Sequence, residues 1–268
     1  PNTFKFCIVV STGTLTILVL TKLNTPLEVA ANDQLELYVV EYECYSLDFV
    51  VQRDKIKSSL KENFTTLYEN KMELFDVIDK WQPDIIHIDE PSERLNRQMV
   101  SKLYEPTRKY RIVETCHDVA FNPDEEKIFH PDLYMFCTPY HEQVFADMES
   151  KYVTIQYPIE VKNTYSPKNE KKIVLNVGLW TRNKNQGEGI EIARKYPNML
   201  FLFAGNQAGN FKDYWEPLMK NLPSNVIVHG ERNDIDTFMK AVDIFMFNST
   251  WECNPLVLRE AISYGLPI

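Results

Sequence analysis

The stretch KIVLNVGLWTRNKNQGEGIEIARKYPNMLFLFAG, residues 172–205, decides the fold. It opens with a short β-branched run, passes through a loop into a segment with helical spacing of apolar residues, and closes with a second apolar run. A strand, a helix and a strand in this order predict two parallel strands joined by a crossover helix. We therefore expect an α/β domain in this part of the chain.

The same alternation continues on both sides of this stretch. Strands are expected at residues 5–11, 15–21, 35–42, 84–88, 111–116, 152–157, 225–230 and 243–248, with a short apolar run at 132–137. Helices are expected within the amphipathic segment 55–81 and at 93–104, 141–148, 211–222, 234–242 and 255–264. Apolar strands that alternate with helices are typical of parallel sheets with helices on both faces.

A polar, proline-containing segment at residues 158–171 divides this pattern and is typical of a linker. It separates a predicted N-terminal Rossmann-like domain, residues 1–157, from a predicted C-terminal one, residues 172–268. The two domains should face a cleft, because ligands of such sheets bind beyond the carboxyl ends of the strands. Seven of the eight glycines follow residue 177, which indicates that the two halves are built differently.

The composition excludes several classes of protein. The net charge is −9, and nucleic-acid binding needs a basic face, so no nucleic-acid partner is expected. Residues 151–200 carry nine basic and four acidic side chains, which form either a solvated linker or an anion site. The five cysteines lie far apart, which predicts reduced thiols, a cytoplasmic protein and no metal site. The most apolar stretch, residues 6–20, is too short and too polar to span a membrane.

The segment STWECNPLVLREAISYGLPI, residues 249–268, carries the strongest chemical signal. Asn254 suits the N-cap of a helix and Pro255 its first position, while Gly265 is a typical stop signal. The helix should begin just beyond the strand at 243–248, so its free N–H groups and positive dipole end point towards the predicted cleft. This arrangement favours the binding of an anion.

Two carboxylates flank the start of this helix. Glu252 lies in the preceding loop, and Glu260 follows eight residues later. A carboxylate can accept hydrogen bonds from two vicinal hydroxyls while helix amides bind a diphosphate, and this combination suits a sugar nucleotide. From spacing alone, Glu260 fits a solvated helix face equally well, and Glu252 fits an ordinary loop acid.

With these two acids, the pattern S-x-x-E-x-x-P-L-V-L-x-E-A-x-x-x-G-x-P resembles the signature of the retaining GT-B glycosyltransferases of family 4. The resemblance implies a GT-B-like α/β fold with two Rossmann-like domains. It also implies that Glu260 holds the ribose of the nucleotide and that Glu252 contacts the donor sugar. The backbone around Asn254, Pro255 and Leu256 would border the sugar and the phosphates, although Pro255 has no N–H to donate.

The loop NVGLWTRNK, residues 176–184, resembles the glycine loop of the same family. There a lysine six residues after the glycine binds the donor diphosphate, which implies this role for Lys184 after Gly178. A cation at this position would stabilise the departing diphosphate. The family usually has arginine directly after the glycine, where this chain has Leu179, and Arg182 is expected to substitute for it.

Three further positions follow from the resemblance. VETCHDV places His117 at the end of a strand, where the imidazole would contact the donor sugar, although a lone histidine is more often structural. Asp118 either orients this imidazole or caps a turn. Gly230 and Arg232 would lie near the base. The resemblance is poor over the first 80 residues, where Gly13 is the single glycine.

We therefore expect a hexosyl-type transferase that moves a sugar from a nucleoside-diphosphate sugar to an acceptor hydroxyl with retention of configuration, without a metal cofactor. The acceptor would be a glycan or a lipid-linked glycan, and the latter would bring the protein to the membrane periphery. The leaving diphosphate would help to deprotonate the acceptor. Because the chain stops soon after Glu260, the second domain is expected to be compact or truncated.

Two alternatives stay open. The first is a non-catalytic protein, derived from a transferase, that binds a nucleotide sugar or a partner. The second, which we rank lower, is a metal-dependent transferase using the D-x-D motif of Asp234 and Asp236, since aspartates are common at the start of a helix. Trp180 and Trp251 fit stacking on a ligand or core packing equally well.

Overall fold

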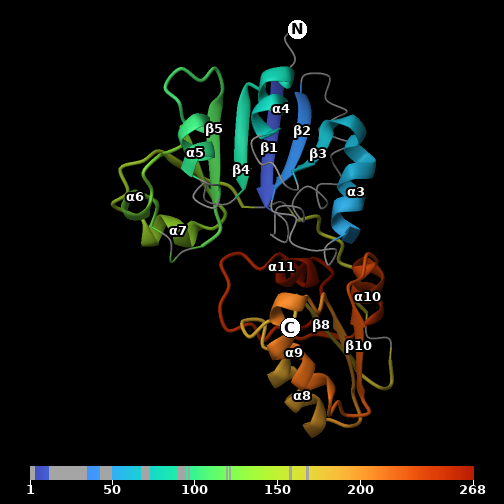
Figure 1. Cartoon of the computed structure of the whole chain (residues 1–268). Helices are drawn as coiled ribbons and strands as arrows, with labels where there is room; N and C mark the ends of the chain where they lie inside the picture. Colours follow the sequence, from blue (N-terminus) through green and yellow to red (C-terminus); the bar gives the residue numbers. More distant parts are fainter. Residues whose placement is uncertain are drawn as a thin grey trace. The chain divides into compact units, whose positions relative to one another are not determined.

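The protein is described from a computed structural model, which divides into two compact units, Pro1–Pro158 and Ile159–Ile268. The residues that the structure describes are 4–11, 35–42, 50–67, 73–89, 95, 97–118, 120, 122–156, 159–166 and 169–268. Figure 1 shows the first unit in blue to green and the second in yellow to red. Each unit is a parallel α/β fold, and each is described by itself.

The first unit contains a parallel sheet of seven strands in the order β3-β2-β1-β4-β5-β6-β7. The strands are β1 (Phe4–Ser11), β2 (Leu35–Tyr42), β3 (Phe64–Leu67), β4 (Ile85–Asp89), β5 (Arg111–Cys116), β6 (Leu133–Phe136) and β7 (Tyr152–Thr154). The strand order reverses between β1 and β4, which makes this the topological switch point of the sheet. Side chains at the carboxyl ends of β4 and β5 therefore lie next to that point.

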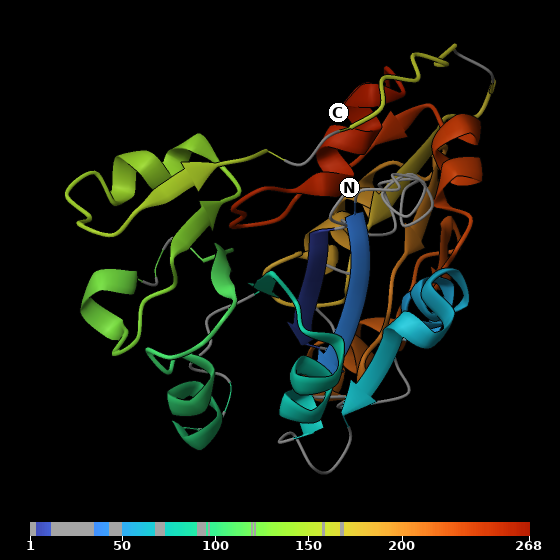
Figure 2. The ribbon, with the colours of Figure 1, turned by 90° about the horizontal axis from the view of Figure 1, so that it is seen from above.

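Helices cover both faces of this sheet (Figure 2). The helices α4 (Glu73–Trp81) and α5 (Arg97–Leu103) pack on the face that carries Cys7 and Val9. The helix α3 (Val50–Leu60) packs on the opposite face, against Ile8. Alternate residues of β1 thus face opposite layers, as the pleat of a strand requires. Within the part of this unit that the structure describes, the remaining helical segments are η2 (Lys61–Asn63), α6 (Pro123–Glu126) and α7 (Pro139–Val144).

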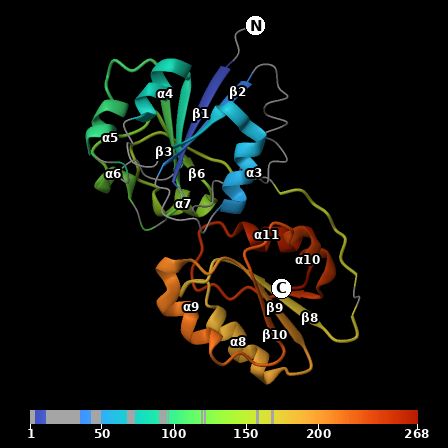
Figure 3. The ribbon, with the colours of Figure 1, turned by 45° about the vertical axis from the view of Figure 1, so that its right-hand side comes forward.

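The second unit contains a parallel sheet of four strands in the order β10-β9-β8-β11. The strands are β8 (Ile173–Val177), β9 (Leu200–Ala204), β10 (Val226–Gly230) and β11 (Ile244–Phe245). The helices are α8 (Gln186–Lys195), α9 (Lys212–Met219), α10 (Ile235–Ala241) and α11 (Leu256–Ser263), with the short η4 (Gly209–Phe211). Figure 3 shows α8 and α9 on one side of the sheet and α10 and α11 on the other. The switch point lies between β8 and β11.

Most of the expected strands and helices are confirmed, and the segment 55–81 is corrected. Helices were expected there, but between the end of α3 and the start of α4 the segment also contains the strand β3. Only four residues of β3 pair with β2, so the run is too short to show an alternating pattern, although Leu67 is fully buried. The strand expected at 15–21 lies outside the described residues.

Part of the segment expected to be a linker is bonded to the second unit. The amides of Lys162 and Asn163 donate to the carbonyl oxygen of Ser263, and the amide of Tyr165 donates to that of Tyr264. These bonds satisfy carbonyl groups at the end of α11, which a helix leaves without intrahelical partners. Among the described residues, no helix has the length and apolar character needed to cross a membrane.

Candidate functional site

Glycines allow close backbone contact at the carboxyl edge of the second sheet. The amide of Gly205 donates to the carbonyl oxygen of Gly230 at 2.7 Å, and that of Gly178 donates to the carbonyl oxygen of Ala204 at 3.0 Å. A Cβ atom on Gly205 would lie 1.8 Å from the carbonyl oxygen of Gly178. A Cβ atom on Gly178 would lie 3.6 Å from Cγ and Cδ of Lys184, so the lysine stem passes over this glycine.

An ion pair between Nζ of Lys184 and Oε1 of Glu252 lies at this edge. The two side chains are 24% and 17% exposed, so water only partly screens the pair. Lys184 lies in the loop after β8, and Glu252 lies in the loop after β11. These two strands flank the switch point, where α/β sheets commonly bind ligands. Two of the residues expected at the site are therefore brought together here.

A network of asparagines holds the two loops together. Oγ1 of Thr250 donates to Oδ1 of Asn183 at 2.9 Å, and the amide of Thr250 donates to the carbonyl oxygen of Asn183 at 2.8 Å. Nδ2 of Asn176 donates to Oδ1 of Asn248 at 3.1 Å, and the Asn248 amide group donates to the carbonyl oxygen of Asn185. No motif in the sequence predicted a role for these residues. Their signal was the density of asparagines on both sides of Lys184.

The helix that follows, α11, begins one residue later than expected. Pro255 has a non-helical ψ of 93° and occupies the N-cap position, with no side-chain cap. Asn254 is therefore not the N-cap, and its Oδ1 accepts from Arg259 at 3.5 Å. Leu256 starts the helix and is buried in the core. Glu260 lies in the second turn and is partly exposed, and its contact with a ribose stays a prediction.

Arg182 does not join Lys184 at the ion pair. Its guanidinium bonds to Oδ2 of Asp213 at 3.1 Å and lies 5.8 Å from the ring centre of Tyr214. The Arg182 side chain is 75% exposed. Trp180, by contrast, is fully buried, so the core-packing interpretation of this residue holds. The role of Arg182 at a diphosphate stays a prediction.

The two aspartates of the D-x-D motif are both bonded to basic side chains. Arg232 donates two hydrogen bonds of 2.8 Å to Asp234, and these bonds hold the pKa of that carboxyl below its ordinary value. Asp236 accepts from Lys162 and Lys240, which lower its pKa in the same way. A metal ion would have to displace these cations. The expected place of Arg232 near the base stays a prediction.

In the first unit, His117 bonds to Asp89, for which the sequence predicted no role. Its Nε2 lies 2.9 Å from Oδ1 of Asp89, which ends β4 and is 1% exposed, whereas His117 is 18% exposed. The carboxylate of Asp118 accepts from the amide of Ala120 at 2.8 Å, which supports the alternative that Asp118 caps a turn. Only the adjacency of β4 and β5 could have indicated Asp89.

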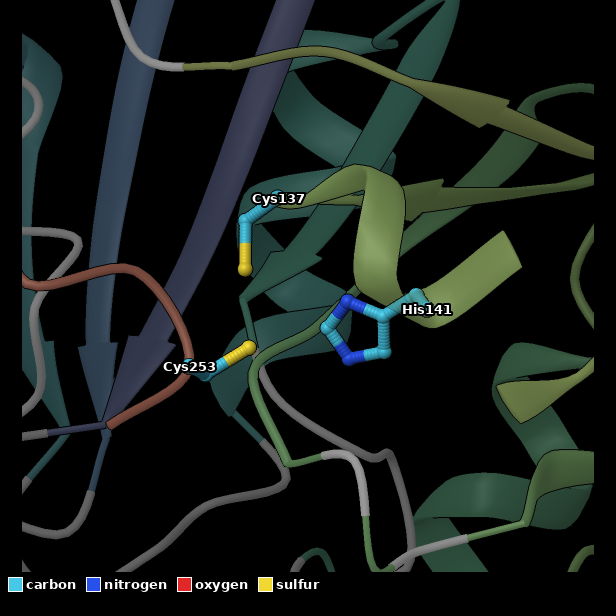
Figure 4. A group of neighbouring side chains, drawn as sticks. All are labelled: Cys137, His141 and Cys253. Atoms are coloured by element: carbon cyan, nitrogen blue, oxygen red, sulfur yellow. The ribbon is translucent and has the colours of Figure 1, made fainter. Parts of the chain in front are cut away.

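Cys137 and His141 of the first unit belong to its core (Figure 4). His141 on α7 is fully buried and stacks on Phe136, with ring centres 5.0 Å apart. The thiol of Cys137 donates to the carbonyl oxygen of Cys116 at 3.5 Å. Cys253, also labelled in Figure 4, lies in the loop before α11 of the second unit. The described cysteines form no disulfide. The expected absence of a metal cofactor stays a prediction.

Comparison with known proteins identifies the second unit most clearly. Residues 159–268 match the family described as Glycosyl transferases group 1. An uncharacterized glycosyltransferase of Methanocaldococcus jannaschii is 31% identical over 102 residues, which are 36% of this chain and 25% of that protein. The UDP-Gal:alpha-D-GlcNAc-diphosphoundecaprenol alpha-1,3-galactosyltransferase of Escherichia coli is 38% identical over 72 residues, which are 26% and 19% of the two chains. The chain thus spans a quarter or less of these relatives.

A solved structure extends the likeness to both units. The crystal structure of Anabaena HepE in complex with UDP and glucose superimposes with a TM-score of 0.70. The superposition covers 98% of this chain and 79% of that one, at 15% sequence identity, and so shows a shared fold. The α/β fold with two parallel sheets is therefore GT-B-like, and residues 159–268 are similar to the glycosyl transferases group 1 family.

Proposed function

We propose that the protein transfers a glycosyl group from a nucleoside-diphosphate sugar to an acceptor hydroxyl with retention of configuration. The observation that carries this proposal is the placement of Lys184 beside Glu252 at the switch point of the second sheet. A partly buried cation there can stabilise the charge of a departing diphosphate. The match of residues 159–268 to the glycosyl transferases group 1 family supports the retaining outcome.

The start of α11 adds to this cation. The first turn of a helix presents N–H groups without intrahelical acceptors, and its dipole favours an anion. In the proposed complex, Lys184 and this turn bind the diphosphate, Glu252 accepts hydroxyls of the sugar, and Glu260 accepts those of the ribose. The departing diphosphate then takes the proton of the acceptor hydroxyl, so the side chains need not supply a base.

We further propose UDP as the nucleotide and a glycan or lipid-linked glycan as the acceptor. The Escherichia coli relative is named for UDP-Gal and a diphosphoundecaprenol-linked sugar, and the Anabaena structure holds UDP and glucose. A lipid-linked acceptor would bring the protein to the membrane periphery. His117, held by Asp89, is proposed to contact the donor sugar.

Calorimetric titration tests the diphosphate site. Wild type and Lys184→Ala are titrated with UDP, GDP and ADP, each with and without EDTA. We expect one nucleotide to bind regardless of EDTA, and its affinity to fall at least about tenfold in the variant, because a partly buried phosphate contact is lost. Lys212→Ala is the matched control, since Lys212 is 59% exposed and pairs with Glu216 on α9. Equal affinity in wild type and Lys184→Ala would contradict the site.

The same nucleotide separates a transferase from a non-catalytic binding protein. A transferase should release the nucleoside diphosphate from its sugar donor in the presence of acceptor, and slowly by hydrolysis without it. We expect this release to disappear in Glu252→Ala, which removes the proposed sugar contact. Binding of the donor without any release from wild type would identify the chain as a binding protein.

A further inference from the structure

The ion pair of the second unit raises a question that rests on the proposed function. Lys184 is proposed to bind the diphosphate, yet its ammonium is already bonded to Glu252. The stem of the lysine is held over Gly178, which restricts where the ammonium can reach. A diphosphate that binds Lys184 must therefore take the place of the carboxylate or share the ammonium with it.

We propose that Glu252 discriminates the intact donor from the spent nucleotide through exchange of this ion pair. When a nucleoside-diphosphate sugar binds, the diphosphate takes Lys184, and the carboxylate of Glu252 turns to the hydroxyls of the sugar. When the sugar has been transferred, Glu252 loses these partners and returns to Lys184. The pair then competes with the remaining nucleoside diphosphate and promotes its release.

The free energy of the exchange depends on what replaces the broken pair. Glu252 is only 17% exposed, and a carboxylate in such a place is costly to leave without a partner. Sugar hydroxyls donate charge-assisted hydrogen bonds to a carboxylate and so offset this cost. A nucleoside diphosphate without a sugar offers no such donor, and its negative charge repels the freed carboxylate.

The loops that carry the two side chains are positioned for such an exchange. Asn183 is bonded to Thr250, and Asn176 to Asn248, so the backbone on both sides of the pair is tied together. Rotation of the two side chains is then enough, with no movement of the sheet. Arg182 does not pair with Glu252, because its guanidinium bonds to Asp213.

Titrations of UDP and UDP-galactose into wild type and Glu252→Gln test the proposal. We expect the substitution to act in opposite directions on the two ligands. UDP should bind about three- to tenfold tighter, because Lys184 is no longer paired, whereas UDP-galactose should bind at least about tenfold more weakly, because the carboxylate that accepts its hydroxyls is gone. Weaker or unchanged binding of UDP would overturn the exchange.

Two controls separate the exchange from a general charge effect. Glu191→Gln removes an exposed acid that pairs with Arg194 on α8 and should leave both affinities unchanged. In a Lys184→Met background, the gain in UDP affinity from Glu252→Gln should be clearly smaller, since no pair is left to break and only the repulsion between Glu252 and the phosphates is relieved. A gain of the same size as in wild type would mean that repulsion alone accounts for it, and the exchange would be wrong.

Circular dichroism spectra and unfolding midpoints establish that each variant is folded. Glu252→Asp keeps the charge but shortens the reach to Lys184, so it should also tighten UDP and weaken UDP-galactose. If none of UDP, GDP and ADP binds any of the folded proteins, both the proposed function and the ion-pair exchange are wrong. If UDP binds wild type and needs Lys184, but no Glu252 variant tightens it, only the exchange is wrong.

Discussion

At the scale of single residues, two glycines at the carboxyl edge of the second sheet determine the position of Lys184. Gly205 lies where the backbones after β8 and β9 meet, and Gly178 lies under the stem of Lys184. A Cβ atom at position 205 would overlap with the carbonyl oxygen of Gly178. The position of Lys184 therefore depends on two residues that contribute no side chain themselves.

Gly205→Ala tests this dependence. Because its Cβ would lie 1.8 Å from a backbone atom, the loop after β8 must shift, and we expect a loss of about 2 kcal/mol in the free energy of unfolding. UDP binding should weaken as well. Urea denaturation and calorimetry measure the two effects. Gly187→Ala is the control, since its Cβ would lie 3.5 Å from Leu218 in ordinary contact, and its stability should not fall.

His87 carries a prediction about pH. Its ring bonds to Thr115 at 2.6 Å, and burial lowers its pKa below the ordinary 6.5, with the charge of Asp89 opposing this shift and that of His117 adding to it. The folded protein thus favours the neutral ring. The stability contributed by this preference is complete above pH 6.5 and is lost as the pH falls below that value towards the folded-state pKa.

We therefore expect the free energy of unfolding to fall more steeply between pH 7 and pH 5 in wild type than in His87→Gln. Urea denaturation at several pH values measures the slope. His130→Gln is the comparison, because that imidazole is 37% exposed at the surface of the first unit. Identical slopes in wild type and His87→Gln would contradict the prediction.

At the scale of elements, the loops after β8 and β11 act as one unit. They follow neighbouring parallel strands, and side chains of Asn183 and Asn248 cross from one loop to the other. A helix then begins directly beyond the second loop, at Leu256. The arrangement brings a cation, a carboxylate and a helix start to the same edge of the sheet.

Asn183→Ala should loosen this arrangement. It removes the side-chain bond from Thr250 and the one to the carbonyl oxygen of Trp251, and each such bond contributes about 1 kcal/mol to stability. We expect a lower unfolding midpoint and weaker UDP binding, measured by thermal denaturation and calorimetry. Asn210→Ala, at an exposed position of η4, should change neither quantity. UDP affinity equal to that of wild type would contradict a role for this contact in the site.

At the scale of the whole molecule, the two units share an architecture and differ in chemistry. Both sheets are parallel and have helices on both faces, and both reverse their strand order once. The second unit places Lys184 and Glu252 at its reversal, while the first places the pair of Asp89 and His117 beside its own. We therefore propose that the nucleotide binds to the second unit.

Hydrogen exchange of the whole chain with and without UDP tests this assignment. We expect UDP to slow exchange in the loops 178–185 and 248–256, because bound ligand stabilises the closed form of its site. The strands β2 and β3 of the first unit lie away from the switch point and should exchange at unchanged rates. Protection confined to those strands would place the nucleotide elsewhere.

Patterns in the amino-acid sequence were enough to predict the alternating strands and helices. They also singled out Glu252, Glu260 and Lys184 as candidate site residues. These features are local, since each depends on residues within a few turns of helix or one loop. The strand β3 was not predicted, because four residues are too few to show an alternation of apolar and polar side chains.

Contacts between residues that are far apart in the chain could be identified only from the tertiary structure. Lys184 and Glu252 are 68 positions apart, and His117 and Asp89 are 28 apart. Lys184 and Glu252 meet because β8 and β11, which are not consecutive in the chain, lie side by side, and Asp89 and His117 meet because the parallel strands β4 and β5 pair across an intervening helix. No local pattern encodes either pairing. Arg182, in the loop after β8, likewise meets a partner that is distant in the chain, Asp213 on α9. Local sequence thus specified the elements, while strand order decided which side chains share the site.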